Sequence, residues 1–109
     1  MMQTDAILNQ LGYMSNEALT GQVTRIIENT KGFEKIGKHI FDLHKALKVE
    51  NSYVAMSNSN DYFKIKIESP SDALKAAALE KIEHFSNKYK VKLQKVEGKD
   101  TYYIIGFNK

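Results

Sequence analysis

The sequence predicts an α+β fold in which N-terminal helices are followed by a β-hairpin–helix–β-hairpin unit. We expect a four-stranded antiparallel sheet with helices on one face, which is a two-layer sandwich. Three observations support this fold class: helical spacing of apolar residues over 4–47, alternation of apolar and polar residues over 52–69 and 90–107, and renewed helical spacing over 71–89. With 109 residues, the chain is predicted to form a single domain, with a helical part (1–50) and a ββαββ part (51–109).

Three helices are predicted in the N-terminal part. The first extends from a Thr4 cap to about Leu11 and is ended by Gly12, and the second opens at Ser15 and ends near Gly32. The third, over 33–47, has apolar side chains at heptad spacing, namely Phe33, Ile36, Ile40, Leu43 and Leu47. Two heptads are too few for a coiled coil, so this stripe predicts packing on a neighbouring helix or on the sheet, with a dimer seam as the alternative.

The first hairpin is predicted from residues 52–56 and 61–69, which are separated by polar turn residues. Pairing Met56 with Phe63 places Val54 opposite Ile65. The apolar side chains of both strands then share one face of the sheet.

The helix between the hairpins is predicted over 71–89. Ser71 is a good N-cap, and Pro70 and Asp72 suit the start of a helix. Its single apolar stripe consists of Leu74, Ala78, Ile82, Phe85 and Tyr89. We expect this stripe to lie on the sheet beside the 33–47 helix.

The second hairpin has predicted strands at 90–96 and 101–107, and its register depends on the loop length. A three-residue loop (98–100) places Val91 and Leu93 on the same face as Ile105 and Phe107. A two-residue loop would place Ile105 and Phe107 among lysines instead. Since a one-residue slip exchanges the two faces of a strand, we predict the three-residue loop.

In these registers the outer face of the sheet carries lysines interleaved with aromatic side chains. The predicted set is Tyr53, Ala55, Tyr62, Lys64, Lys66, Lys90, Lys92, Tyr102 and Ile104. Single-stranded nucleic acids bind such faces, because lysines follow phosphates while aromatic rings stack on bases. An ordinary solvated face of an antiparallel sheet has a similar composition.

The net charge of +3 is concentrated at the C-terminal end, where residues 88–109 carry six lysines against Glu97 and Asp100. Arg25 is the single arginine. Because arginine is the usual side chain for bidentate contacts to bases, its scarcity counts against specific base readout. A composition rich in Lys, Asn and Ile suits an AT-rich bacterial or phage genome.

Several function classes are disfavoured by the sequence. There is no cysteine, so disulfides and thiolate sites are excluded. His39 and His44 do not share a helix face, and Glu80 with His84 lacks a third ligand, so no metal site is predicted. No catalytic or phosphate-binding motif is present, and we predict neither enzymatic activity nor a cofactor. The absence of a membrane span or an apparent signal peptide predicts a cytoplasmic protein without membrane contact.

The leading functional hypothesis from the sequence is a small binding or regulatory domain that contacts another protein, as a homodimer or with a different partner. The three N-terminal helices bring more apolar surface than one sheet face can cover, and the last strand is apolar on both faces. Nucleic-acid binding is the alternative, through the Lys/Tyr sheet face or through a winged-helix-like N-terminal half. The winged-helix interpretation would use the polar side of the third helix, with Lys35, Lys38, His39, Asp42 and Lys45.

Overall fold

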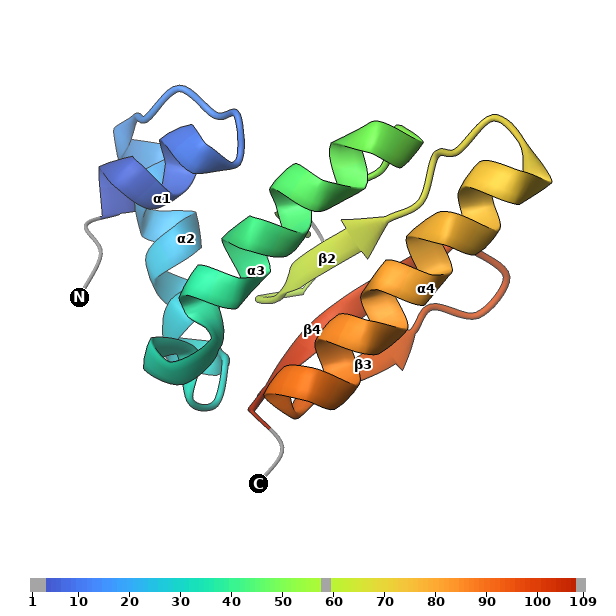
Figure 1. Ribbon diagram of the computed structural model, residues 1–109. Coiled ribbons are helices and arrows are strands. Elements are labelled where there is room, and N and C mark those ends of the chain that lie inside the picture. The colour runs from blue at the N-terminus through green and yellow to red at the C-terminus, as the bar shows by residue number, and fades with distance from the viewer. Residues whose placement is uncertain (1–3, 58–59, 108–109) are drawn as a thin grey trace.

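The computed structural model describes residues 4–57 and 60–107 and has the predicted α+β fold (Figure 1). The helices are α1 (Thr4–Gln10), α2 (Glu17–Asn29), α3 (Phe33–Leu47), the short 3₁₀ helix η1 (Lys48–Glu50) and α4 (Asp72–Tyr89). The strands are β1 (Tyr53–Met56), β2 (Phe63–Lys66), β3 (Val91–Lys95) and β4 (Thr101–Phe107). All neighbouring strands are antiparallel, in the spatial order β1-β2-β4-β3, so the first strands of the two hairpins form the edges.

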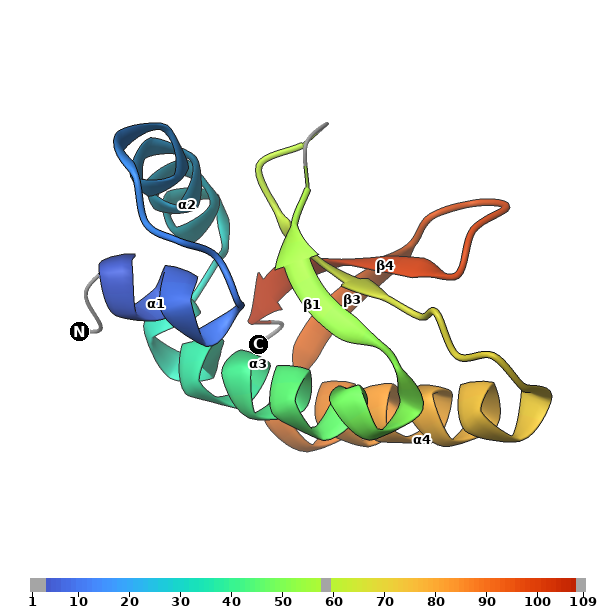
Figure 2. The same ribbon diagram turned by 90° about the horizontal axis from the view of Figure 1, so that it is seen from above.

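Helices α3 and α4 lie side by side on one face of the sheet, as predicted (Figure 2). The N-cap of α4 is Ser71, whose hydroxyl accepts a hydrogen bond from the Leu74 N–H at 3.2 Å. The second helix begins one residue later than expected, because the Asn16 side chain is its N-cap and accepts from the Leu19 N–H at 2.8 Å. The apolar stripe of α3 is buried along its whole length.

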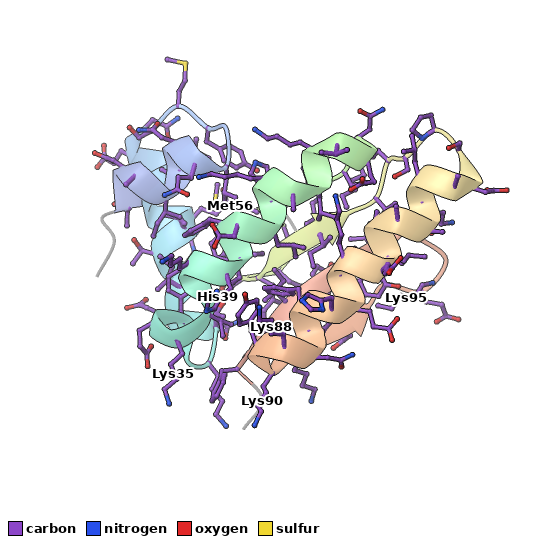
Figure 3. All side chains as sticks on the ribbon, viewed as in Figure 1. Lys35, His39, Met56, Lys88, Lys90 and Lys95 are labelled. Carbon is purple, nitrogen blue, oxygen red and sulfur yellow. The ribbon has the colours of Figure 1, made fainter. Side chains whose placement is uncertain are left out.

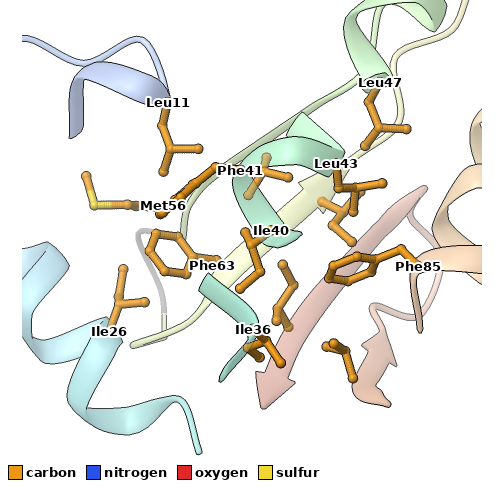
Figure 4. Packing of buried hydrophobic residues seen from close by; sticks show 14 of the residues in the cluster. Leu11, Ile26, Ile36, Ile40, Phe41, Leu43, Leu47, Met56, Phe63 and Phe85 are labelled. Carbon is orange, nitrogen blue, oxygen red and sulfur yellow. The ribbon is translucent and has the colours of Figure 1, made fainter. Parts of the chain in front are cut away.

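The first two helices pack against the β1–β2 hairpin and the side of α3 (Figures 1 and 2). Leu11 and Ile26 reach the cluster formed by Phe41, Met56 and Phe63 (Figure 4). The Phe41 and Phe63 rings meet edge to face, with centroids 6.3 Å apart. The apolar surface of the N-terminal helices is therefore buried within the same chain, where it extends the core beyond the sheet.

The register of the first hairpin is as predicted, with Val54 opposite Ile65 and Met56 opposite Phe63. All four side chains are buried against the helices. The strands are shorter than expected, because pairing ends at Lys66 and the following segment leaves the sheet to reach α4.

The register predicted for the second hairpin is correct at one end and wrong at the other. Val91 pairs with Phe107 as expected, but Leu93 pairs with Ile104, and Ile105 has no partner on β3. This β-bulge shifts the remainder of the strand by one residue, so the turn occupies 97–100 and the Val96 N–H donates to the Thr101 carbonyl at 2.8 Å.

The bulge reverses the faces expected for part of β4. Ile104 is completely buried beneath the helices, and Tyr102 packs against the core, whereas both were predicted on the outer face. Tyr103, which pairs with Lys64, takes the outer position instead. Ile105 does not join the core cluster and is half-buried.

A backbone contact between distant segments accompanies the bulge. The Phe107 N–H donates to the Lys31 carbonyl at 2.6 Å, which ties the end of β4 to the turn between α2 and α3. Gly106 lies at the crossing, with φ of +150° and with space for no side chain, because a Cβ would approach the Lys31 nitrogen to 2.7 Å. Only glycine allows the two backbones to approach this closely.

Candidate functional site

No helix formed by residues 4–57 and 60–107 covers the outer face of the sheet (Figure 2). Its central row crosses all four strands and consists of Ala55, Lys64, Tyr103 and Gln94, which are paired in that order. A second row joins Tyr53, Lys66 and Thr101, and Lys92 lies opposite Gly106 on β3. None of these strand positions is acidic.

The structure brings together most of the predicted outer-face residues. Tyr53, Lys64 and Lys66 lie on this face, Tyr62 directly precedes β2, and Lys92 is exposed on the β3 edge. Lys90 is exposed but belongs to the end of α4, where it adopts a left-handed conformation with φ of 56°. Tyr102 and Ile104 are not on the outer face, and Tyr103 is. Both differences from the prediction follow from the β-bulge, which the sequence did not reveal.

Two tyrosines form an aromatic pair on this face. The ring centroids of Tyr62 and Tyr103 are 5.7 Å apart with planes tilted by 39°. The Asn60 side-chain amide donates to the Tyr103 hydroxyl at 3.1 Å. Both rings are half-buried, so each is held by its neighbours while part of its surface contacts solvent.

A hollow of about 280 Å³ lies between the two hairpins on the same face. Its lining includes three lysines, Lys64 and Lys66 from β2 and Lys99 from the β3–β4 turn, and residues Ser57, Val96, Thr101 and Tyr103. The sole ion pair among the three lysines, within the described residues, joins Lys66 Nζ to the Glu68 carboxylate at 3.4 Å. Both partners are roughly half-exposed, so this pair is weak.

Hollows in the helical layer have a different electrostatic character. The groove between α3 and α4 has a volume of about 540 Å³ and includes Asp42 and Glu80 in its lining. His39, which is labelled in Figure 3, lies in this groove. Its ring is stacked on that of Tyr89, with the two ring centroids 3.6 Å apart. A hollow of about 780 Å³ beside α2 and α3 has Glu28 and Glu34 in its lining. Carboxylates therefore accompany cations on the helical side, whereas lysines alone carry charge in the hollow on the sheet.

The free edge of β1 is occupied by side chains of the same chain. The Val54 N–H donates to His44 Nδ1 at 3.0 Å, and the Met56 N–H donates to the Tyr13 hydroxyl at 3.1 Å. Gln22 donates to the Ser57 carbonyl at 3.1 Å. These bonds block the addition of another strand at this edge.

The opposite edge, β3, carries exposed Lys92 and Lys95, with Gln94 between them. Lysines on an edge strand oppose pairing with another edge of the same charge. The Ser86 hydroxyl also donates to the Val91 carbonyl at 2.7 Å. Neither edge therefore favours a dimer made by continuing the sheet.

The pKa of His44 is displaced by its surroundings. Burial lowers the pKa of the imidazole below its usual value of 6.5, and the nearby Lys48 and Lys45 charges lower it further. Because Nδ1 accepts from Val54, the imidazole is neutral with its proton on Nε2, which has no hydrogen-bond partner among the described residues. His44 therefore acts as a structural acceptor for the β1 edge.

The described residues contain no group of three or more His, Asp or Glu side chains able to hold a metal ion. No helix in this part of the chain combines the length and apolar character needed to cross a bilayer. Comparison with protein-family models, curated proteins and solved structures found no match to this chain.

Proposed function

We propose that this protein is a non-catalytic nucleic-acid-binding domain that uses the outer face of its sheet. The observation that carries the proposal is the combination of Lys64, Lys66 and Lys92 with Tyr62 and Tyr103 on an uncovered face whose strand positions hold no carboxylate. Lysines provide sequence-independent attraction to phosphates, and tyrosine rings provide surfaces for bases.

The sheet is a better candidate than α3 for this role. The exposed side of α3 mixes Lys35 and Lys38 with Glu34 and Asp42, and α4 packs along one flank of the helix. A helix that reads a major groove must enter it with its side chains free on both flanks. The winged-helix use of α3 therefore receives less support than the sheet face.

Protein contact is a second candidate for the role of the outer face, and an apolar side chain that is half-buried outside the core cluster, Ile105, favours protein contact. A homodimer joined through this face would oppose the lysines of two copies, which costs energy unless an anion lies between them. In addition, the surplus of apolar surface that suggested a dimer is largely buried within one chain; exposed large apolar side chains in the described part are limited to Met14 and Val49. Sedimentation velocity in the presence and absence of nucleic acid would distinguish the two candidates.

Fluorescence anisotropy with labelled 12-nucleotide single strands and a 12-base-pair duplex would test the proposal. Three lysine–phosphate contacts on a single strand predict a salt slope of about −2.1, so the affinity should fall about 20-fold between 50 and 200 mM salt. The variant Lys64→Ala/Lys66→Ala/Lys92→Ala should lose most of this binding.

The matched control removes Lys38, Lys45 and Lys48, which are exposed on the helical side, and changes the net charge from +3 to 0 just as the first variant does. The control should bind nearly as tightly as the parent protein. No binding of any oligonucleotide at 50 mM salt would refute nucleic-acid binding, and equal losses in both variants would show that total charge, not the sheet face, is responsible.

A further inference from the structure

We propose that the hollow between the hairpins seats one phosphate of a single-stranded nucleic acid, and that the adjoining base stacks on the Tyr62–Tyr103 pair. This inference rests on the proposed function and specifies the class of ligand and the position of its parts. It is carried by three features: the lysines that line the hollow, the aromatic pair beside it and the divergence of the two hairpins (Figure 2).

The lysines approach the hollow from two separate hairpins. Lys64 and Lys66 are two residues apart on β2, so their side chains leave the same face about 7 Å apart. Lys99 approaches from the β3–β4 turn. Neither Lys64 nor Lys99 has an ion-pair partner in the described part of the chain. Three lysines in the lining of one small hollow favour an anion with several charged oxygens, and lysine is a common phosphate ligand.

Tyr103 connects the hollow to the aromatic pair, because its side chain lines the hollow and also contacts the Tyr62 ring. A nucleotide whose phosphate lies among the lysines can therefore place its base against these rings. The bases of a duplex are stacked on one another and cannot offer a face to a protein side chain. Bases of a single strand can do so, which selects single strands over duplexes.

The width of the sheet limits the length of strand that it can bind. Three inter-strand spacings of about 4.8 Å give a platform about 14 Å wide. Sheet platforms of this kind stack two or three bases. We expect the affinity to rise with oligonucleotide length up to about four nucleotides. Longer strands should gain affinity only because one strand then offers several overlapping positions at which the protein can bind.

The stacking step can be tested by comparing a thymidine 12-mer with an abasic 12-mer that has the same phosphates. The parent protein should bind the thymidine strand about tenfold or more tightly. Tyr103→Leu should reduce the ratio of the two affinities to near one, because the leucine side chain offers no ring for the base. Retention of the full preference in Tyr103→Leu would refute the stacking site.

Binding of a phosphate in the hollow, called the phosphate seat below, can be tested with one substitution that should weaken binding and one that should strengthen it. Lys99→Ala, in an exposed turn, should reduce the magnitude of the salt slope by about 0.7. Glu68→Gln should tighten binding, because it releases Lys66 from its ion pair. This variant is informative because misfolding would lower the affinity and could not raise it. Lys95→Ala is the matched control, since this exposed β3 lysine is not part of the lining.

These outcomes separate the inference from the proposed function. If duplex and single strands bind equally and Lys99→Ala leaves the slope unchanged, the seat is refuted while binding by the sheet face stands. If the Lys64/Lys66/Lys92 variant binds as well as the parent protein, the proposed function is refuted as well. A twofold or greater gain for Glu68→Gln, together with a reduced slope for Lys99→Ala, is the result expected of the seat.

Discussion

Acidification should destabilise this protein through His44, which is 4% exposed. The neutral imidazole accepts the Val54 N–H at 3.0 Å. A second proton would occupy Nδ1, remove this acceptor and place a charge in an apolar site beside Lys48 and Lys45. The folded state therefore resists protonation at His44, and an unfolded chain does not.

The sign and the pH window follow from the lowered pKa. Below about pH 6.5 the unfolded chain binds more protons at this position than the folded chain, so stability falls as the pH falls. The loss continues until the pH reaches the folded pKa of His44. Each pH unit within the window costs at most about 1.4 kcal/mol, so the loss at pH 5.5 relative to pH 7.5 has a ceiling of about 1.4 kcal/mol.

The assay is urea denaturation followed by circular dichroism at half-unit intervals from pH 5.0 to 7.5, on the parent protein and on His44→Asn. Asparagine retains a side-chain oxygen that can accept from the Val54 N–H but does not titrate. His39 and His84 are present in both proteins, so the difference between the two curves isolates His44. Parallel curves for the two proteins would show that His44 is not held neutral by the fold, and the reasoning would then be wrong.

Three further substitutions test the packing described above, each by urea denaturation at pH 7.5. Gly106→Ala should cost about 2–3 kcal/mol, because its Cβ would meet backbone atoms of the α2–α3 turn at 2.7 Å; a neutral result would contradict the close approach. Tyr13→Phe should cost about 1–2 kcal/mol by leaving the Met56 N–H without its acceptor, and an unchanged midpoint would mean that water replaces the hydroxyl. Ile104→Ala should cost about 2–5 kcal/mol and Ile105→Ala about 1 kcal/mol. A larger loss for Ile105→Ala than for Ile104→Ala would indicate that Ile105 is the buried residue, as in the register without a bulge.

The secondary structure and the first hairpin could be predicted because they depend on local pattern. The apolar stripe of α3 marks a helix whose bounds match the prediction, and Ser71 marks the start of α4. Strand alternation and a short turn favour Val54 opposite Ile65, since a one-residue slip would turn the apolar side chains of one strand to the other face. Much of the outer face followed from the same alternation, including Lys64 and Lys66.

The sequence alone determined the α+β class, the order of the elements and the side of β2 on which lysines lie, because these follow from residues close together in the chain. Only the tertiary structure decided the strand order, the bulge at Ile105 and the exchange of Ile104 for Tyr103 on the outer face. The physical reason is that β4 pairs with β2 and β3 and also bonds to Lys31, which lies far from it in sequence. Alternating apolar residues on both faces of β4 made either register plausible locally, and these distant contacts select one.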